Sequence, residues 1–514
     1  MHWPQRDSEH VLVTAAEMTT FENQILSSGI PEAALMEKVG QEMTAWFLQH
    51  SALIQDGVVV IVGPGHNGGD GLVVARELYL AGVEVKVWCP LTIKKSLTLK
   101  HISHVNWLGI KQLDAPPDCS DPSLWIDALF GLGQSRRLPQ DLAKLFHNRH
   151  LKAPGRLVSL DIPSGICTDT GASFIGGAAV ASFTLTVGLV KKGLVQDSAI
   201  RNVGCLQRID IGYPIDVFER LSSSLPVRVL STDLKTLKWP KCPLNASKYN
   251  RGRTLIVAGS DQYPGAALLA LKGAIASGLG SVKAVVPKTV ANSLWQVLPE
   301  VVLQSSLEDS VLERIDSLLI GPGLGEVESD YLPWLSLLQD FRGLLVLDAD
   351  ALNKLSLFGE RWDWLQSRKG QTWITPHEAE FSRLFPEIDK LSLLDKAVEA
   401  AQLSGAVVLL KGAHSVIADP NGKTWQLVDT FPWAARAGFG DLLAGFSAGV
   451  GAISMASQEG ISSDYFALSA FVHAEAARSA KQGSSPSSIV GCLERLVRNI
   501  QSRDLCIDSI ICAK

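Results

Sequence analysis

The sequence of 514 residues lacks the patterns that mark several large classes of protein. Its eight cysteines include no Cys-x-x-Cys pair, which favours reduced thiols over a disulfide framework or a zinc site. It has no long run of like charge, and 47 Lys and Arg against 52 Asp and Glu give a net charge of −5. Proteins that bind nucleic acids or membrane surfaces usually carry a basic stripe, so we expect neither kind of partner.

Long apolar segments are missing as well. The longest uncharged apolar stretch, residues 442–457, is shorter than the roughly 20 residues that span a bilayer. Residues 1–10 are polar and charged, so we expect no signal-peptide core and a soluble, cytoplasmic protein. A composition with 46% hydrophobic and 19% charged residues is that of a globular protein, and the length predicts more than one hydrophobic core.

Two series of short apolar runs predict two different α/β domains. The first half has strand-like runs at residues 58–62, 83–88, 124–128, 156–160 and 182–187. The second half has them at residues 254–258, 281–286, 317–320, 344–347, 371–374 and 406–410. Helical stretches separate these runs, which is the pattern of open, mostly parallel sheets with helices on both faces. No internal repeat relates the two halves.

A polar stretch of small residues at 222–226 predicts the boundary between the halves. We therefore expect a first domain over residues 1–222, a linker over 223–245 and a second domain over 246–514. The expected fold class is α/β in both, with a Rossmann-like three-layer α/β/α arrangement in the first.

A glycine-rich turn follows the first of these strands. Residues 63–71 contain five glycines and lead into a helix, so backbone N–H groups and the helix N-terminus can approach an anion. A tight turn without a ligand is the alternative. The second strand ends Val87-Trp88-Cys89-Pro90 and lacks the acidic residue that holds the ribose in a Rossmann dehydrogenase, so we do not expect a conventional hydride-transfer site.

Carboxylates stand at two further strand ends of this half. Asp127 and Asp161 each precede a turn rich in glycine. Ligand sites of parallel sheets gather at the carboxyl ends of the strands, so these two residues and Asp70 could converge. Taken singly, each could equally be a helix cap or a turn former.

Several separated motifs then identify a family resemblance over about residues 10–220. The turn, together with Asp127-Ala-Leu-Phe-Gly-Leu-Gly, Asp161-Ile-Pro-Ser-Gly and Lys191-Lys-Gly-Leu, resembles the YjeF N-terminal domain, the NAD(P)H-hydrate epimerase. The resemblance implies Asp161 as the acid/base catalyst and a potassium ion held by Asn67, Asp127 and Ser164. It also implies that the hydrated nucleotide binds to His66, Asn67, Gly68, Gly69, Asp70, Gly131, Leu132, Gly133, Gln134, Ser135, Arg136, Arg137 and Asp161. His66 stands where the family usually has Asn.

The second half has a different set of glycine turns. It contains no P-loop sequence, but Gly438 and Gly440 open a helix whose N-terminal amides could hold an anion, with Asp441 in its first turn. Asp441 could also be there only as a favourable partner of the helix dipole. Small residues at 444, 445, 448 and 449 predict that this helix packs closely against a neighbour.

From about residue 248 onward, these motifs resemble the ribokinase-like YjeF C-terminal domain, the ADP- or ATP-dependent NAD(P)H-hydrate dehydratase. The resemblance implies that Ala266, Gly323, His377 and Asp441 bind the hydrate, with Asp441 catalytic, and that Glu380 helps to organise magnesium. It also implies that ADP or ATP binds to Lys411, Gly412, Ala413, His414, Ser415 and Gly440. Together the two halves resemble the bifunctional NAD(P)H-hydrate repair enzymes, which implies NADHX and NADPHX as substrates. We also expect a homo-oligomer.

The loop before Asp441 departs from the family pattern. Trp433, Arg436 and Phe439 stand where the family has Gly, Thr and Thr, and residues 247–249 replace its usual His-Lys-Gly. Arg436 could replace a lost hydroxyl as a phosphate ligand, or it could be a solvated surface arginine. Two other functions stay open: a ribokinase-like kinase with an accessory domain, and a nucleotide-binding regulatory protein without dehydratase activity.

Overall fold

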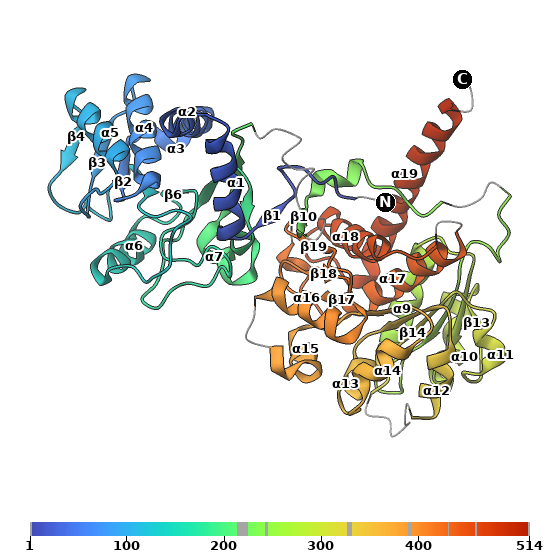
Figure 1. Cartoon of the computed structure of the whole chain (residues 1–514). Helices are drawn as coiled ribbons and strands as arrows, with labels where there is room; N and C mark the ends of the chain where they lie inside the picture. The colour runs from blue at the N-terminus through green and yellow to red at the C-terminus, as the bar shows by residue number, and fades with distance from the viewer. Residues whose placement is uncertain are drawn as a thin grey trace. The chain divides into compact units, whose positions relative to one another are not determined.

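The computed structural model describes residues 3–212, 225–241, 245–325, 332–388, 392–429, 431–457 and 460–511. The chain forms two compact units (Figure 1). One is Arg6–Leu225, and the other comprises Met1–Gln5 and Pro226–Lys514. Ser222, where the predicted boundary begins, lies outside the described residues.

A seven-stranded sheet forms the centre of the first unit. Its strands are β2 (Val58–Val62), β3 (Val85–Trp88), β4 (Lys111–Leu113), β5 (Leu124–Ala128), β6 (Leu157–Leu160), β7 (Phe183–Val187) and β9 (Cys205–Ile209). They lie in the order β4-β3-β2-β5-β6-β7-β9, and every neighbouring pair is parallel. The predicted parallel sheet is confirmed, and the strand order reverses between β2 and β5, where such folds bind ligands.

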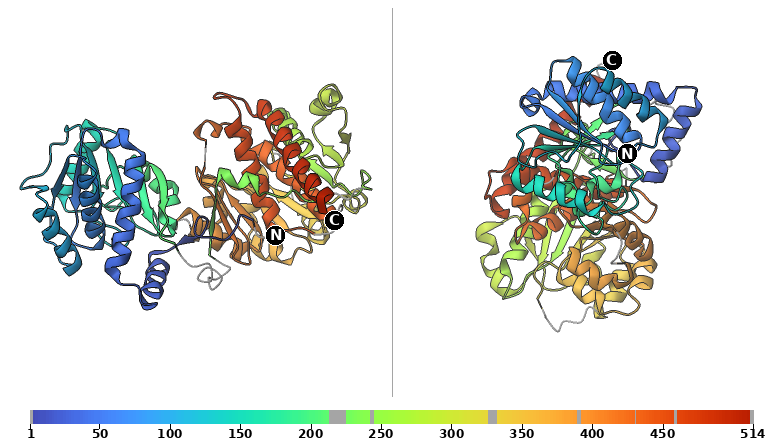
Figure 2. Two further views of the ribbon diagram at one scale, coloured as in Figure 1. Left: turned by 90° about the horizontal axis from the view of Figure 1, so that it is seen from above. Right: turned by 90° about the vertical axis from the view of Figure 1, so that its left-hand side faces the viewer.

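Helices cover both faces of this sheet, as Figures 1 and 2 show. Successive side chains of β2 point to opposite faces of the sheet. Val60 packs on one face against α2 (Glu32–Gln49), α4 (His66–Leu80) and α5 (Ser96–Trp107). Ile61 packs on the other face against α6 (Gln140–Lys152). A strand that is buried on both faces reads as a continuous apolar run, which is the pattern seen in the sequence.

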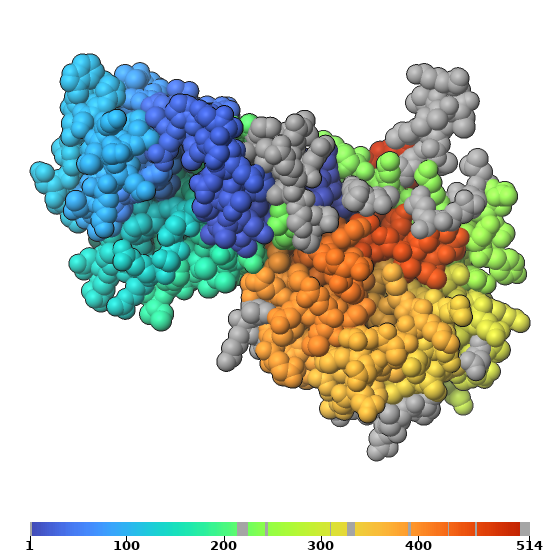
Figure 3. Space-filling model, viewed as in Figure 1, coloured from blue at the N-terminus to red at the C-terminus, as the bar shows by residue number. Residues whose placement is uncertain are grey.

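Smaller elements complete the first unit. Helix α1 (Ala15–Ser27) lies on the outside (Figure 3) and buries Met18 and Phe21. Near it, β1 (Leu12–Val13) pairs in parallel with β8 (Val190–Lys191). The short helices are α3 (Ser51–Ile54) and α7 (Ile200–Val203). The β1–β8 pair fixes the backbone at Lys191, whose role at the site is described below.

The second unit is built on a ten-stranded sheet. Its strands are β10 (Val227–Val229), β11 (Arg253–Val257), β12 (Ser281–Val285), β13 (Val302–Leu303), β14 (Ser317–Ile320), β15 (Leu344–Leu347), β16 (Thr372–Ile374), β17 (Val407–Leu410), β18 (Val416–Ala418) and β19 (Thr424–Leu427). They lie in the order β10-β19-β18-β17-β16-β15-β14-β11-β12-β13. Among these strands of the described residues, only β18 runs antiparallel to its neighbours, so the predicted mostly parallel sheet is confirmed.

The helices of this unit pack around the sheet. They are α9 (Pro264–Ala276), α10 (Lys288–Val297), α11 (Asp309–Leu312), α12 (Leu332–Asp340), α13 (Asp350–Ser356), α14 (Arg361–Ser367), α15 (Glu378–Leu384), α16 (Leu393–Ser404), α17 (Phe439–Ala456), α18 (Ser463–Ser479) and α19 (Pro486–Ile511). Among the described helices, α17 has the length and apolar composition of a membrane span, but 78% of it is buried in the unit. It is a core helix here.

Helices α9 and α17 touch through their backbones. A Cβ atom at Gly445 would overlap the carbonyl group of Ala270, and one at Gly273 would overlap that of Leu442. The close approach that the small residues predicted for this helix is therefore confirmed. Because α17 begins at Phe439, this contact also fixes the position of the turn that leads into Asp441.

Part of the range 223–245, which we expected to be a linker, belongs to the second unit. Strand β10 pairs in parallel with β19, and a 3-10 helix, Ser231–Lys235, follows it. Trp3 joins the same unit: its indole N–H donates to the carbonyl of Asp233 at 3.3 Å, and its own carbonyl accepts from the indole of Trp425 at 3.0 Å. The sequence did not predict these contacts.

Candidate active sites

The first candidate site lies where the strand order of the first unit reverses. The turn after β2 rests directly on the segment after β5, because a Cβ at Gly63 would overlap the carbonyl of Leu129. A Cβ at Gly68 would in turn overlap the carbonyl of Gly63. Glycine is thus required by close backbone contact, and the N-terminus of α4 faces the ends of β2 and β5.

Asp161 is held in this site by several interactions. It follows β6 with a φ of 62°, a conformation that is strained for a residue with a side chain. Its Oδ1 lies 2.5 Å from Nζ of Lys191, whose side chain is 1% exposed. Its Oδ2 accepts a hydrogen bond from the backbone N–H of Leu132 at 3.1 Å. One oxygen of the carboxylate thus contacts the loop after β5, and the other pairs with the buried ammonium of Lys191.

The carboxyl groups of Asp70 and Glu22 lie near Asp161 in the same cavity. Burial raises the pKa of Asp70 well above its ordinary value, and the charges of Asp161 and Glu22 raise that pKa further. Burial also raises the pKa of Glu22, which the charge of Lys191 opposes. A cluster with one ammonium and three carboxyl groups favours a shared proton. Asp70 is the group best placed to carry that proton, and Asp161 is the group with a cationic partner.

Asp127 lies completely buried at the end of β5. Its carboxylate accepts four hydrogen bonds: from the N–H of Leu129, from the N–H and hydroxyl of Ser164, and from the hydroxyl of Ser159. Burial raises the pKa of Asp127, and these four bonds oppose that rise. The hydrogen bonds with Ser159 and Ser164 also join the end of β5 to the end of β6, so Asp127 stabilises the two strand ends at the site.

The oxygen atoms of Asn67, Asp127 and Ser164 are of the type that a hard cation such as potassium prefers. The amide nitrogen of Asn67 donates to the carbonyl of Leu160 at 3.2 Å, which leaves its Oδ1 available. A carboxylate has about four lone-pair positions, and the four donors on Asp127 already use them. A cation bound there would take the place of a donor, and the hydroxyl groups of Ser159 and Ser164 can both rotate away.

The structure brings most of the sequence-predicted epimerase residues together. A cavity of about 410 Å³ is lined by His66, Asn67, Asp70, Gly131, Leu132, Gly133, Gln134 and Asp161. Ser135, Arg136 and Arg137 line an adjoining cavity, whereas Gly68 and Gly69 are buried within α4. The imidazole Nδ1 of His66 lies 2.9 Å from a carboxylate oxygen of Glu32, so α2 anchors the side chain that departs from the family pattern.

The second candidate site lies at the carboxyl ends of β15, β16 and β17. Asp348 follows β15, and its side chain is 2% exposed. It accepts hydrogen bonds from the hydroxyl of Thr375 at 2.6 Å and from the ammonium of Lys411 at 2.8 Å. Burial alone would lower the pKa of Lys411, but Asp348 and then Glu380 reverse that effect, and the net shift is upward. Lys411 thus provides a fixed positive charge in the site.

His377 and Glu380 form the N-terminal cap of α15. The Nδ1 of His377 accepts from the N–H groups of Ala379 and Glu380, and the carboxylate of Glu380 accepts from the N–H of His377 at 2.8 Å. Burial raises the pKa of Glu380, and the charge of Lys411 opposes this. The capping contacts give both residues a structural role beside the binding and magnesium roles that the resemblance implies.

Asp441 stands in the first turn of α17, opposite this cluster. Burial and then the charge of Asp348 raise the pKa of Asp441 to about 6, although Lys411 lowers it. The helix is entered through Gly438, whose φ of 90° favours glycine. A cavity of about 730 Å³ is lined by His377, Lys411, Gly412, Ala413, Ser415, Gly440 and Asp441.

Some predicted residues of this half lie elsewhere. Ala266 and Gly323 are neighbours of one another, because a Cβ at Gly323 would lie 2.5 Å from that of Ala266. They sit where the strand order reverses between β11 and β14, and they do not belong to the described lining of the 730 Å³ cavity. His414 is also outside that lining. Its backbone carbonyl accepts a hydrogen bond from the side chain of Gln426.

The structure gives Arg436 two backbone partners, and its phosphate-binding role stays a prediction. Its Nη1 donates to the backbone carbonyls of Gly483 and Ser484, at 2.8 and 3.0 Å. The guanidinium thus connects the altered loop to the segment just before α19, and Arg436 also lines the cavity. Phe439 is buried and packs edge-on against His473, and burial lowers the pKa of His473 to about 4.

Sequence reasoning gave no role to several residues of the two sites. Lys191 was part of a motif, but its contact with Asp161 was not predicted; the β1–β8 pair positions its backbone. Glu22 comes from α1 and Asp348 from the end of β15. Asp348 follows the predicted strand 344–347, and this position at a strand end was the one feature of the sequence that could have indicated its role.

Comparisons with known proteins agree with this two-domain organisation. The family model for YjeF-related protein N-termini matches residues 32–193, and the model for NAD(P)H-hydrate dehydratase matches residues 254–497. A solved structure with a similar fold is the ADP/ATP-dependent NAD(P)H-hydrate dehydratase of Bacillus subtilis, co-crystallised with ATP and Mg²⁺. It is 27% identical and covers 52% of this chain and 96% of its own, with a TM-score of 0.44.

Curated relatives match both halves of the chain. The protein of Synechocystis is 39% identical over 85% of this chain and 85% of its own length. That of Gloeobacter violaceus is 37% identical over 84% and 87%, and that of Thermosynechococcus vestitus is 35% identical over 92% and 93%. Each is named bifunctional NAD(P)H-hydrate repair enzyme Nnr. With two α/β units, a site in each and relatives that match along most of its length, this chain belongs to the family of bifunctional NAD(P)H-hydrate repair enzymes.

Proposed function

We propose that this chain repairs hydrated NADH and NADPH. The first unit interconverts the R and S epimers of the hydrate, and the second unit dehydrates the S epimer with ADP or ATP to regenerate the reduced cofactor. The observation that carries this function is the match of the named relatives along both units. Each unit also holds a carboxylate in a cavity at the carboxyl edge of its sheet.

The carboxyl cluster of the first unit suits the epimerisation. The two epimers differ at the carbon that carries the added hydroxyl group. Its C–O bond must break, with the hydroxyl leaving as water, and a water molecule must then add to the opposite face and lose a proton. This requires one group that accepts a proton and one that delivers it. We assign the acceptor role to Asp161, which is paired with Lys191, and the donor role to Asp70, whose pKa is raised by burial and by its acidic neighbours.

A potassium ion belongs to the same proposal. It would be held by Asn67, Asp127 and Ser164, and it would supply positive charge beside a bound nucleotide. The hydroxyl of Ser164 donates to Asp127 at 2.7 Å, so the chain places these two oxygen atoms side by side as an oxygen cradle. The cradle fits the ion chemically, because rotation of this hydroxyl away from Asp127 frees a lone pair on each oxygen atom.

The second unit suits a phosphoryl-transfer route to dehydration. Hydroxide is a poor leaving group, and transfer of the terminal phosphoryl group of ADP or ATP to the ring hydroxyl leaves AMP or ADP and makes a phosphate ester. Inorganic phosphate then departs as the neighbouring ring carbon loses a proton, and the ring double bond forms again. Asp441 would accept the hydroxyl proton, since its pKa of about 6 lies near neutrality. The N–H groups at the start of α17 and the ammonium of Lys411 would balance the charge on the transferred group.

Magnesium would accompany the nucleotide. Among the described residues, no group of three or more His, Cys, Asp or Glu is arranged to hold a metal ion. Magnesium commonly uses one or two carboxylates together with substrate phosphates and water. The site therefore fits an ion that arrives with the nucleotide, near Glu380 and Asp441.

The function is tested with the purified full chain and a mixture of both NADHX epimers. Without nucleotide, chromatography should show interconversion of the epimers and no NADH. With ADP or ATP and Mg²⁺, both epimers should be converted to NADH, which is followed by its near-ultraviolet absorbance. Accumulation of a stable phosphorylated hydrate would instead support the kinase alternative, and the absence of both reactions would support a regulatory protein.

A cytoplasmic location and a homo-oligomeric state stay predictions of the sequence. Cell fractionation tests the location. Sedimentation velocity with the purified chain tests the oligomeric state, and a species with the mass of one chain, 55.3 kDa, would contradict it.

A further inference from the structure

A second cavity, of about 1180 Å³, adjoins the first candidate site. The two cavities share four lining residues, Pro64, Phe130, Gly133 and Gln134, so they form one continuous groove. The smaller cavity, of about 410 Å³, lies at the low end of the 300–1,000 Å³ that is typical of sites for drug-sized ligands. A dinucleotide bound at Asp161 would therefore extend into the larger cavity.

The two parts of this groove have opposite charge. The lining of the smaller cavity contains Glu22, Glu32, Asp70 and Asp161, with Lys95 as a cation. The described lining of the larger cavity contains Lys94, Arg136, Arg137 and Lys144 and no Asp or Glu. In the part of the chain that the structure describes, no carboxylate pairs with these four cations. Their charges are therefore available to an anionic ligand.

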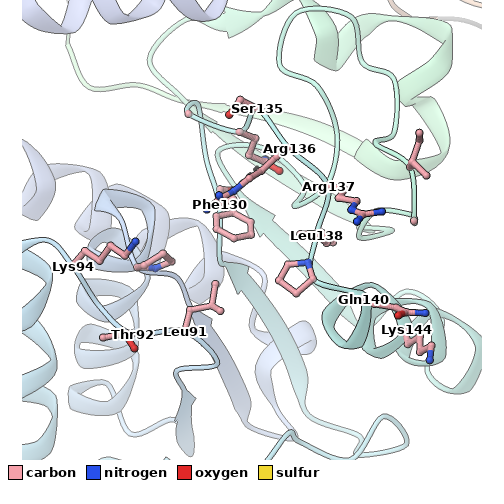
Figure 4. Close-up of a pocket in the computed structure, with 16 residues that line it drawn as sticks. Leu91, Thr92, Lys94, Phe130, Ser135, Arg136, Arg137, Leu138, Gln140 and Lys144 are labelled. Atoms are coloured by element: carbon pink, nitrogen blue, oxygen red, sulfur yellow. Dashed lines mark hydrogen bonds between the residues drawn. The ribbon is translucent and has the colours of Figure 1, made fainter.

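The cations stand in two groups. Figure 4 shows the end of Arg136 beside the Phe130 ring and Lys94 to the left of that ring, and Phe130 lines both cavities. Arg137 and Lys144 lie to the right of Phe130 in the same view, with Lys144 the farthest from it, on helix α6 beside Gln140. A ligand that enters from the smaller cavity would thus meet Lys94 and Arg136 first and the other pair beyond them.

Charge counting suggests what each pair binds. The pyrophosphate of a dinucleotide carries two negative charges, which one pair of cations balances. A phosphate monoester adds about −1.5 to −2 at neutral pH, and NADPHX differs from NADHX by one such group, on the adenosine 2′-oxygen. Four cations exceed the need of NADHX and match that of NADPHX.

We propose that Lys144, together with Arg137, binds the adenosine 2′-phosphate of hydrated NADPH and makes the epimerase unit favour NADPHX over NADHX. Lys94 and Arg136 then bind the pyrophosphate that both substrates share. The guanidinium of Arg137 can grip phosphate oxygens in a bidentate manner, and Lys144 adds a point charge. This inference rests on the proposed epimerase function.

The test is the initial rate of epimerisation, without added nucleotide, for NADHX and NADPHX separately. Lys144→Ala should lower kcat/KM for NADPHX about three- to tenfold more than for NADHX, as expected when one charge-assisted contact is lost. Lys94→Ala should lower kcat/KM for both substrates by similar factors. Lys152→Ala is the matched control, because Lys152 is an exposed lysine at the end of the same helix and outside the described lining.

A second measurement uses the unmodified protein. Adenosine 2′,5′-bisphosphate should inhibit epimerisation more strongly than adenosine 5′-monophosphate, and Lys144→Ala should reduce this difference. Equal inhibition by the two compounds, or an equal effect of Lys144→Ala on both hydrates, would overturn the inference. Failure of the unmodified chain to epimerise either hydrate would instead contradict the proposed function.

Discussion

Asp441 and Asp70 both have raised pKa values, but their neighbours differ. Asp441 faces Asp348, and the ammonium of Lys411 opposes the effect, which leaves its pKa at about 6. Asp70 faces Asp161 and Glu22, and these carboxylates add to the effect of burial. The same residue type is thereby suited to accept a proton in one unit and to donate one in the other.

The raised pKa of Asp441 predicts the pH dependence of dehydration. A general base must be ionised, so the rate should fall as the pH drops through about 6, where this carboxyl group becomes protonated. The measurement is kcat for the S epimer at saturating nucleotide across this range. Asp441→Asn should lower the rate about 10²–10⁴-fold and abolish the acidic limb. A limb that persists in the variant would mean that another group is the base.

Potassium dependence is predicted for the epimerase at the Asp127 cradle. Asp127→Ala should lower epimerisation and its response to added potassium, because the charged oxygen ligand is lost. Ser164→Ala should lower the potassium response less, because it removes a neutral hydroxyl ligand and no charge. Epimerisation is measured in potassium and in a bulky organic cation as the comparison salt. Equal rates of the unmodified chain in both salts would contradict the assignment.

At the level of elements, the contact between α9 and α17 determines where Asp441 lies. Gly445→Ala would push a methyl group into the carbonyl of Ala270, and overpacking of this kind costs about 1–3 kcal/mol. We expect a lower urea midpoint for the second unit and slower dehydration. Gly491→Ala is the control, because this exposed glycine of α19 has open space at its Cβ. There, alanine should leave the stability unchanged or raise it by up to about 1 kcal/mol. Equal midpoints for the two variants would contradict the packing account.

The sequence predicted the central strands of both sheets but not the peripheral ones. Strands β2 and β15 are buried on every residue, and continuous apolar runs are a strong local signal. Strands β4 and β13 are exposed or half-buried edges, and β10 has three residues that pair with β19 about 200 positions away. Their pairing depends on distant parts of the chain, so no local pattern could predict it.

In the two sites as well, contacts between residues that are distant in sequence could not be predicted. Motifs placed Asp127, Asp161 and Asp441 at strand or helix ends, because glycine turns are visible in the sequence. The contact of Lys191 with Asp161 depends on how β8 pairs, and the contacts of Arg436 with residues 483 and 484 depend on two loops that are distant in sequence. These side-chain contacts required the fold.

At the scale of the whole molecule, the two units have separate cores and separate sites. An epimerase beside a dehydratase that uses one epimer allows the whole pool of hydrate to be repaired. The central claim is that Asp161 serves only the first reaction and Asp441 only the second.

Complementation between two variants tests this claim most directly. Asp161→Asn alone should convert the S epimer of an NADHX mixture to NADH and convert the R epimer only at its slow spontaneous rate. Asp441→Asn alone should interconvert the epimers and form almost no NADH. An equimolar mixture of the two variants, with ADP or ATP and Mg²⁺, should convert both epimers completely, as the unmodified chain does. If the mixture converted no more hydrate than Asp161→Asn alone, the assignment of one carboxylate to each reaction would be contradicted.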